Sequence, residues 1–269
     1  MLHVKTTVAY VALVLLLISC SKDDKPLPDG PGENMPRYLL DSVAWKDYDY
    51  HALFRYNSDS TENRIIYKSA VATDTLRFTY LNKKVETIAS TRSPRTSRYF
   101  YNSEGKVSKI VMTSLYSPSV TTLEFFYEGK KLSKLDYYIT NEAGKKLVWA
   151  STYEYNAQSL PAKIVSVSNN GHTVTRVIEG YTEECSFNAW VFISAVSIEE
   201  MYELYNYPLL GSMTRFPRKV TTLTNGVPEK VHFFTVEQED KKLHKMLSRG
   251  EFPGNPEYNF SSEAAFFYK

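Results

Sequence analysis

The sequence predicts an all-β fold, an antiparallel meander of repeated hairpins that forms a strongly curved sheet or a barrel-like structure. Aromatic residues make up 14% of the chain, with 21 tyrosines against 11 glycines, and aromatic side chains favour pleated, half-buried strands. Short runs of alternating aromatic residues recur along the body of the chain. Polar turns containing Asn, Gly or Lys follow these runs, as in β-hairpins.

The first 19 residues have the form of a cleavable export signal. Lys5 precedes an apolar run from Val8 to Ile18. A membrane-spanning helix needs about 20 apolar residues, so this shorter run fits a signal peptide better than a membrane anchor. We therefore expect residues 1–19 to be removed.

The segment Leu17-Ile18-Ser19-Cys20 resembles the lipobox of bacterial lipoproteins. In that family a diacylglyceryl group is attached to the cysteine and the chain is cut just before it. The resemblance implies that Cys20 is the lipid-attachment residue, and that its acyl chains, palmitate among them, hold the protein on a membrane.

The charged residues Lys22, Asp23 and Asp24 follow the cysteine directly. They are similar to the acidic export tag of surface-exposed lipoproteins of the Bacteroidota, and this resemblance implies a lipid-anchored protein of the outer membrane, exposed at the cell surface. An ordinary solvated charge run is the alternative. The next residues are rich in Pro and Gly, so we expect a flexible tether over 20–36 and a single β-repeat domain over 37–269.

The repeat combines a run of aromatics ending in Tyr, a polar turn and, in the longer copies, an aliphatic residue after the turn. Each copy fits two strands joined by a tight hairpin. The five clear copies begin at Phe54, Phe78, Tyr99, Phe125 and Tyr153, and a fainter copy runs from Phe234 to Leu243.

Alternation within the strands predicts one buried face and one wet face. Lys109, Lys134 and Lys163 each stand just before an aliphatic residue that follows a turn. We expect these lysines on the solvent face.

One short helix is predicted near 197–206. Apolar residues there recur at helical spacing, and Ser197 with Glu200 has the pattern of a capping box. Such a helix could plug one end of a curved sheet or cover a sheet edge.

The repeats resemble two known groups of proteins. One is the set of tyrosine-rich hairpin repeats in large bacterial shell-forming proteins. The other is a family of Bacteroidota lipoproteins of unknown function with a porin-like β fold; this resemblance covers residues 50–269, including Tyr207–Gly211 and Phe216–Val220. Neither resemblance implies a catalytic residue.

The composition and the known motifs give little support to an enzyme. The net charge of +2 does not favour a nucleic-acid partner. A Gly-x-Ser-x-Gly elbow and a phosphate-binding glycine loop are both absent from the sequence. Neighbouring residues on a strand point to opposite faces, so Glu183 and Glu184 cannot form a catalytic pair.

The cysteines and histidines predict neither a disulfide nor a metal site, and we expect no cofactor. Once Cys20 carries lipid, Cys185 has no partner in the chain, and we interpret it as a small apolar filler. His232 and His244 could face each other across a hairpin, but two imidazoles alone make a poor metal site. We interpret them as solvent-facing strand residues.

Two further sets of residues are candidates for contacts with sugars. Ser42, Ser60 and Thr75 lie in tripeptides that resemble the short O-glycosylation sequon of exported Bacteroidota proteins. A set of aromatics could stack on sugar rings or form an interface, although filling the sheet's core is the favoured reading. These aromatics are Trp149, Trp190, Tyr137, Tyr138, Phe125 and Phe126.

We therefore expect a non-enzymatic cell-envelope lipoprotein, a surface module that binds a glycan or an envelope protein. A structural, assembly or lipid-carrying component of the outer membrane is the alternative, and an outward apolar band would favour insertion. A glycan hydrolase is a third option. It would need two carboxylates placed across a cleft.

Overall fold

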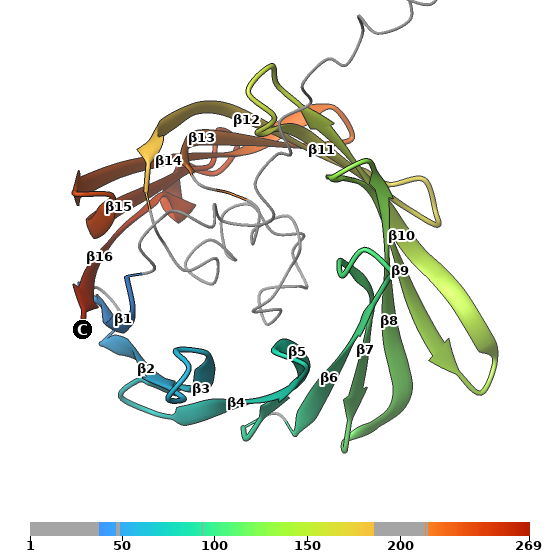
Figure 1. Ribbon diagram of the computed structural model, residues 1–269. Coiled ribbons are helices and arrows are strands. Elements are labelled where there is room, and N and C mark those ends of the chain that lie inside the picture. Colours follow the sequence, from blue (N-terminus) through green and yellow to red (C-terminus); the bar gives the residue numbers. More distant parts are fainter. Residues whose placement is uncertain (1–37, 47–48, 93, 186–212, 214) are drawn as a thin grey trace, which may run out of the picture. The chain divides into compact units, whose positions relative to one another are not determined.

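The computed structural model describes residues 38–46, 49–92, 94–185, 213 and 215–269. They form one closed barrel in which neighbouring strands run antiparallel, as predicted (Figure 1). The strands follow chain order around the ring, and β1 pairs with β16 to close it. The strands are β1 (Leu40–Trp45), β2 (Tyr50–Tyr56), β3 (Glu62–Lys68), β4 (Thr73–Leu81), β5 (Lys84–Ser90), β6 (Arg95–Tyr101), β7 (Val107–Ser114), β8 (Ser117–Glu128), β9 (Lys131–Asn141), β10 (Gly144–Tyr155), β11 (Pro161–Ser168), β12 (Thr173–Glu184), β13 (Arg215–Thr224), β14 (Val227–Glu239), β15 (Lys242–Glu251) and β16 (Phe260–Tyr268).

The helix predicted near 197–206 lies outside the described residues. A short 3-10 helix, η3 (Pro256–Tyr258), occupies the connection between β15 and β16. Among the residues that the structure describes, no helix is long and apolar enough to cross a bilayer.

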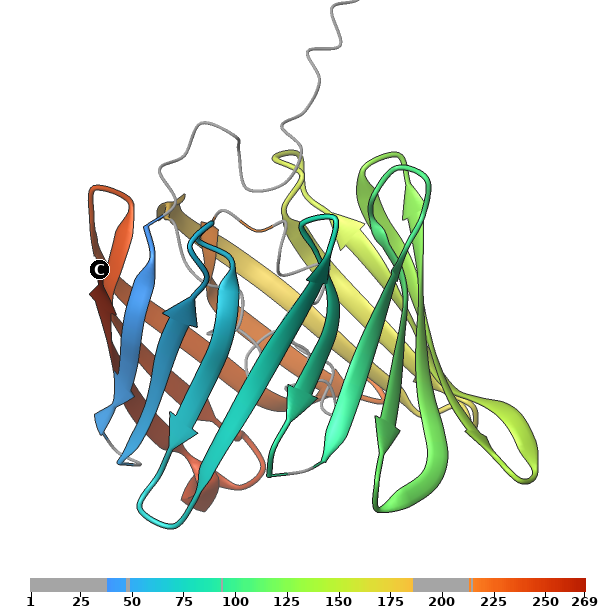
Figure 2. The same cartoon turned by 60° about the horizontal axis from the view of Figure 1, so that its bottom comes forward.

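The barrel has two rims that differ in their turns (Figure 2). The even-numbered strands end at one of them, which we call the tyrosine rim. The two-residue turns Asn82-Lys83 and Asp240-Lys241 there place both residues at positive φ. Five-residue turns such as Asn102–Lys106 are closed by a backbone bond of 2.9 Å between their first and last residues. Their fourth residue, here Gly105, has positive φ, which explains the Asn, Gly and Lys of the repeat.

Tyrosines tie neighbouring hairpins together along this rim. Each lies at or near the end of an even-numbered strand and donates its hydroxyl to a backbone carbonyl near the start of the preceding strand. The bonds join Tyr56 to Leu40, Tyr80 to Glu62, Tyr101 to Val85, Tyr127 to Val107, Tyr155 to Leu132, Tyr181 to Pro161 and Tyr268 to Leu243. In β14 the corresponding place is taken by Gln238, whose amide donates to the carbonyl of Glu184.

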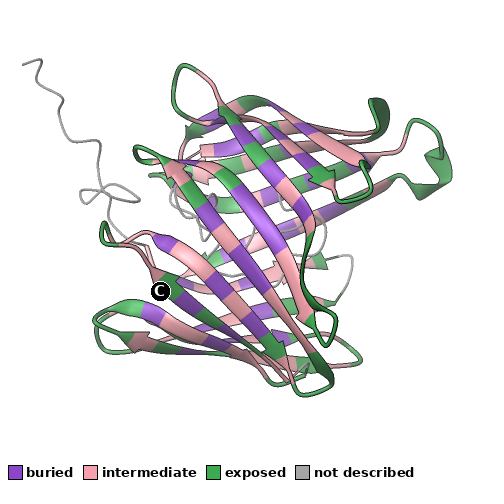
Figure 3. Cartoon of the chain, turned by 90° about the vertical axis from the view of Figure 1, so that its right-hand side faces the viewer, coloured by how far each residue is buried: buried purple, intermediate pink, exposed green. Residues whose placement is uncertain are grey.

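The wall of the barrel has a buried face and an exposed face, seen as alternating bands along the strands (Figure 3). Phe54, Ile65, Leu123 and Leu135 have no exposed surface. Among the described elements, neither a helical layer nor a second sheet covers the outside of the barrel. Fully buried side chains therefore face its inside, and the residues that alternate with them form the outer wall.

Candidate functional site

The outer wall carries many charged side chains joined in ion pairs, together with some exposed apolar side chains such as Phe126, Val167 and Phe267. Lys163 contacts Glu154 at 2.8 Å between Nζ and Oε1, and Lys134 contacts Asp136 at 2.9 Å between Nζ and Oδ2. Further pairs join neighbouring strands, among them Lys219 with Glu179 and Lys245 with Glu263, and the pair of Lys145 with Glu124 reaches from β10 across β9 to β8. The solvent face predicted for the lysines at 109, 134 and 163 is therefore this outer wall.

The aromatics considered for stacking on sugars divide between the two faces. Trp149 is buried on the inner face and stacks on Tyr137, with ring centroids 5.0 Å apart. Phe125 is also buried, with 4% of its surface exposed. On the outer wall, Tyr138 and Phe126 each lie beneath a lysine ammonium. Trp190 lies outside the described residues.

His232 occupies a buried polar cluster on the inner face, so its interpretation as a solvent-facing residue is wrong. Its Nε2 lies 2.5 Å from the Ser248 hydroxyl, and its ring stacks on Phe234 with centroids 4.4 Å apart. The Phe260 ring packs edge-on against it and also covers Gly250, where an added Cβ would lie 2.2 Å from a ring carbon.

The pairing of β14 and β15 separates the two histidines that sequence analysis considered together. His232 lies opposite Gly250, whereas His244 lies near the other end of β15 and is exposed. Burial, with a smaller contribution from Lys230, lowers the pKa of His232 to about 3. The imidazole is therefore neutral at neutral pH, and within the described residues His232 Nδ1 has no hydrogen-bond partner. Across the described part of the chain, no three His, Cys, Asp or Glu side chains form a group that could hold a metal ion.

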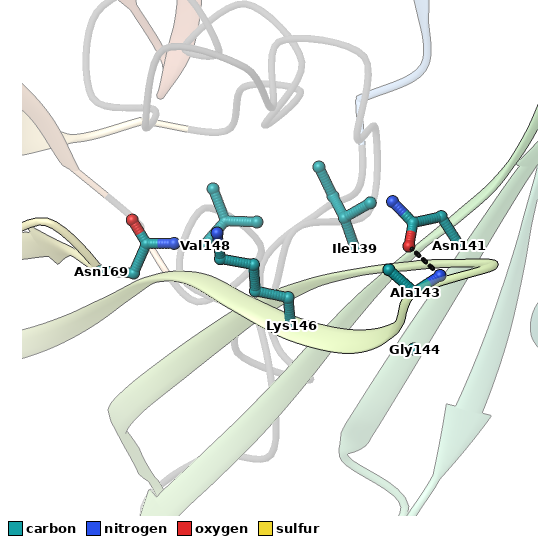
Figure 4. Close-up of a pocket in the computed structure, with 7 residues that line it drawn as sticks. All are labelled: Ile139, Asn141, Ala143, Gly144, Lys146, Val148 and Asn169. Carbon is teal, nitrogen blue, oxygen red and sulfur yellow. Dashed lines mark hydrogen bonds between the residues drawn. The ribbon is translucent and has the colours of Figure 1, made fainter.

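A shallow hollow of about 420 Å³ lies at the rim opposite the tyrosines (Figure 4). Ile139 and Val148 supply apolar walls, and Asn141, Lys146 and Asn169 supply polar groups. Asn141 Oδ1 already accepts a bond from the Ala143 amide at 2.9 Å. The Asn169 side chain donates to a carbonyl of β10 at 3.2 Å. Two of the polar groups are thus engaged in shaping the turns.

The candidate glycosylation residues are separate from one another. Ser42 and Thr75 lie within strands, whereas Ser60 is in the turn between β2 and β3. The aspartates that precede Ser60 and Thr75 each organise a turn. Asp59, before Ser60, accepts bonds from the Thr61 amide and hydroxyl. The proposed lipid and export residues, Cys20, Lys22, Asp23 and Asp24, lie outside the described residues.

Asp74, before Thr75, holds the turn between β5 and β6. Its carboxylate accepts bonds from the amides of Thr91 and Arg92 and from the hydroxyl of Ser90. These and other hydrogen bonds lower the pKa of Asp74 although burial opposes them.

Cys185 is buried, with 1% of its surface exposed. Burial raises the pKa of its thiol to about 11, so the thiol is protonated at neutral pH. This environment suits an inert apolar filler.

A row of arginines on the outer wall was missed by sequence analysis. Strand pairing places Arg55 opposite Arg64, and Arg64 opposite Arg77, so three cations follow one another across β2, β3 and β4. Arg98 lies on the same wall of β6. Like charges directly opposite on a sheet are destabilising, by up to about 1 kcal/mol per pair.

Three of these four arginines differ from the ion-paired lysines of the outer wall, because no carboxylate of the described residues pairs with them. Arg55 has Asp41 at 3.4 Å. Arg64, Arg77 and Arg98 are exposed and form no ion pair within the described part of the chain. Arg55 and Arg64 flank a single hairpin turn, but the register shift between Arg55 and Tyr56 that places them opposite each other has no signal in the sequence.

Comparison with known proteins gives the fold. No family model matches the chain, and no curated protein matches it. A porin-like protein from Bacteroides uniformis ATCC 8492 is 12% identical, covers 87% of this chain and 98% of its own, and has a TM-score of 0.58. A porin-like protein from Bacteroides vulgatus ATCC 8482 is 9% identical, covers 86% and 99%, and has a TM-score of 0.51. The expected β-barrel fold is confirmed, and it is similar to the fold of these two porin-like proteins.

Proposed function

We propose that the protein is a non-enzymatic binding module of the cell envelope, held on the outer membrane by lipid on Cys20. In this proposal the export residues Lys22, Asp23 and Asp24 direct it to the cell surface, where its outer wall meets a glycan or protein partner. The lipid is its membrane anchor, and the barrel stands in water.

The charged side chains of the outer wall carry this proposal. In a transmembrane barrel the outward face is an apolar band, and each Arg or Lys at the bilayer midplane costs about 2–4 kcal/mol. Arg64, Arg77 and Arg98 alone would cost on the order of 6–12 kcal/mol there. The ion-paired lysines would add to this cost, so the distribution of charge favours a wall that faces water.

The inner face supports a second candidate, a lipid-carrying role. Trp149, Tyr137 and Phe125 make part of that face apolar and aromatic, which suits an acyl chain better than a sugar. A glycan hydrolase has weaker support, because Glu183 is exposed and Glu184 is next to it on the same strand.

Alkaline carbonate extraction of membranes tests the proposal. Two forms of the protein are compared, the unmodified chain and a Cys20→Ser form. In the Cys20→Ser form a non-lipoprotein signal peptide also replaces residues 1–19. The unmodified chain should stay with the membranes and incorporate labelled palmitate, whereas the Cys20→Ser form should be released without detergent. A Cys20→Ser form that resists carbonate would show that the barrel itself is inserted and would overturn the proposal.

A further inference from the structure

We infer that the arginine row on β2–β6 binds an acidic glycan, a polysaccharide whose sugars carry carboxylate or sulfate groups. This inference rests on the proposed function and assigns to it a ligand class and a surface. The surface, called here the arginine wall, consists of Arg64, Arg77 and Arg98, with Arg55 at its end.

The charge of the arginine wall selects an anionic ligand. On other parts of the outer wall several lysines contact carboxylates of the same chain, as Lys145 contacts Glu124 at 2.7 Å. The arginine wall departs from this pattern, because direct strand pairing brings Arg64 and Arg77 together without such a carboxylate. An anion bound between them would relieve their repulsion. Guanidinium groups also bind carboxylate and sulfate through paired hydrogen bonds, which ammonium groups cannot match.

The extent of the arginine wall favours an extended ligand. Arg55 and Arg98 lie on strands four spacings apart, which is about 19 Å at the usual distance between strands. A single small anion cannot reach all four guanidinium groups, whereas a chain with repeated charges can follow them around the barrel.

The surroundings of the arginine wall favour a sugar polymer over a lipid surface. Threonines lie between Arg77 and Arg98, and the hydroxyls of Thr79 and Thr87 are 2.7 Å apart on exposed strands. Hydroxyl groups suit the hydroxyls of a sugar. Among the described residues of β2–β6, three large apolar side chains are exposed: Val71 in the turn between β3 and β4, Leu81 at the end of β4, and Phe100, which lies two residues from Arg98 beneath the ammonium of Lys109. A convex wall also cannot lie flat against a bilayer along its circumference.

The test measures binding of the full lipidated chain, in detergent micelles, to polygalacturonate, heparin and neutral dextran. The unmodified chain should bind the two acidic polymers and not dextran, with an affinity that decreases as salt increases. The triple variant R64Q/R77Q/R98Q should bind them at least about tenfold more weakly, because charged hydrogen bonds are lost. The three positions are exposed, and Arg64 and Arg77 repel each other across paired strands, so the variant should denature at the same urea concentration as the unmodified chain or a higher one.

The matched control is K134Q/K163Q/K219Q, which removes the same charge from ion-paired positions of the outer wall. It should change the affinity for either acidic polymer less than about twofold. An equal loss in both triple variants, or unchanged binding by the arginine variant, would overturn the inference. Failure of the unmodified chain to bind either acidic polymer would also overturn the inference. Phosphatidylglycerol vesicles are tested alongside, and binding to these vesicles but to neither polymer would identify a lipid surface as the ligand instead. Failure of the proposed function is detected by a separate experiment, the carbonate extraction, in which the Cys20→Ser form would stay with the membranes.

Discussion

The tyrosine bonds between hairpins make a quantitative prediction about stability. In Tyr127→Phe the ring remains, but its hydroxyl no longer donates to the Val107 carbonyl, a bond of 2.7 Å. A hydrogen bond contributes about 0.5–1.5 kcal/mol net, and a half-buried carbonyl left without this partner adds to the loss. Burial raises the pKa of Tyr127 above its ordinary value, which is consistent with a hydroxyl shielded from water. We expect the free energy of unfolding to decrease by about 1–2 kcal/mol.

Urea denaturation of protein produced without residues 1–20 measures this loss, with tryptophan fluorescence and circular dichroism as independent probes. Tyr116→Phe is the matched control, because Tyr116 is 81% exposed. The double variant Tyr101→Phe/Tyr127→Phe should lose about the sum of the two single losses, since the tyrosines lie on different hairpins. If Tyr127→Phe and Tyr116→Phe have the same effect, the tyrosine bonds do not stabilise the barrel and the reasoning is refuted.

Two further predictions concern the inner face. The pKa of His232 is about 3 in the barrel against an ordinary value of 6.5, so between these values the unfolded chain binds a proton that the barrel does not. Stability should therefore fall as the pH is lowered from about 6.5, and in His232→Gln the urea midpoint should fall less over the same range. Gly250→Ala should cost about 1–3 kcal/mol, because the added methyl collides with the Phe260 ring.

Each of these predictions has its own control. Gly254→Ala meets no atom within 4 Å, so its urea midpoint should match that of the unmodified protein, and a loss equal to that of Gly250→Ala would contradict the packing argument. If the urea midpoint falls equally with decreasing pH in His232→Gln and in the unmodified chain, groups other than His232 control the acid dependence of stability.

The sequence predicted the hairpins well and the closure of the sheet only loosely. A tyrosine followed by a polar turn is a local signal, and it identified five of the tyrosines that lie along the tyrosine rim. Tyr181 and Tyr268 were missed because neither is followed by a short turn. Closure depends on the summed twist and stagger of all strands, and no single segment of sequence encodes it.

The sites were harder to predict than the strands. Alternation places His232 on the same face as Phe234, so its burial could have been read from the strand pattern. The arginine wall depends on register, and an irregularity between Arg55 and Tyr56 shifts the pairing of β2 with β3. Counting outward from the turn alone would therefore not have placed Arg55 opposite Arg64.

The pairing of β1 with β16 means that the ring needs both its first and its last strand. The contact extends to Lys269, whose amide donates to the Leu39 carbonyl at 2.9 Å. In a chain made from its N-terminus, the edge of β1 has no neighbour on that side until the final strand is synthesised. A fragment that stops before β16 would carry two unpaired edges, and unpaired edges recruit strands from other chains. Premature termination is therefore expected to yield aggregates in place of smaller barrels.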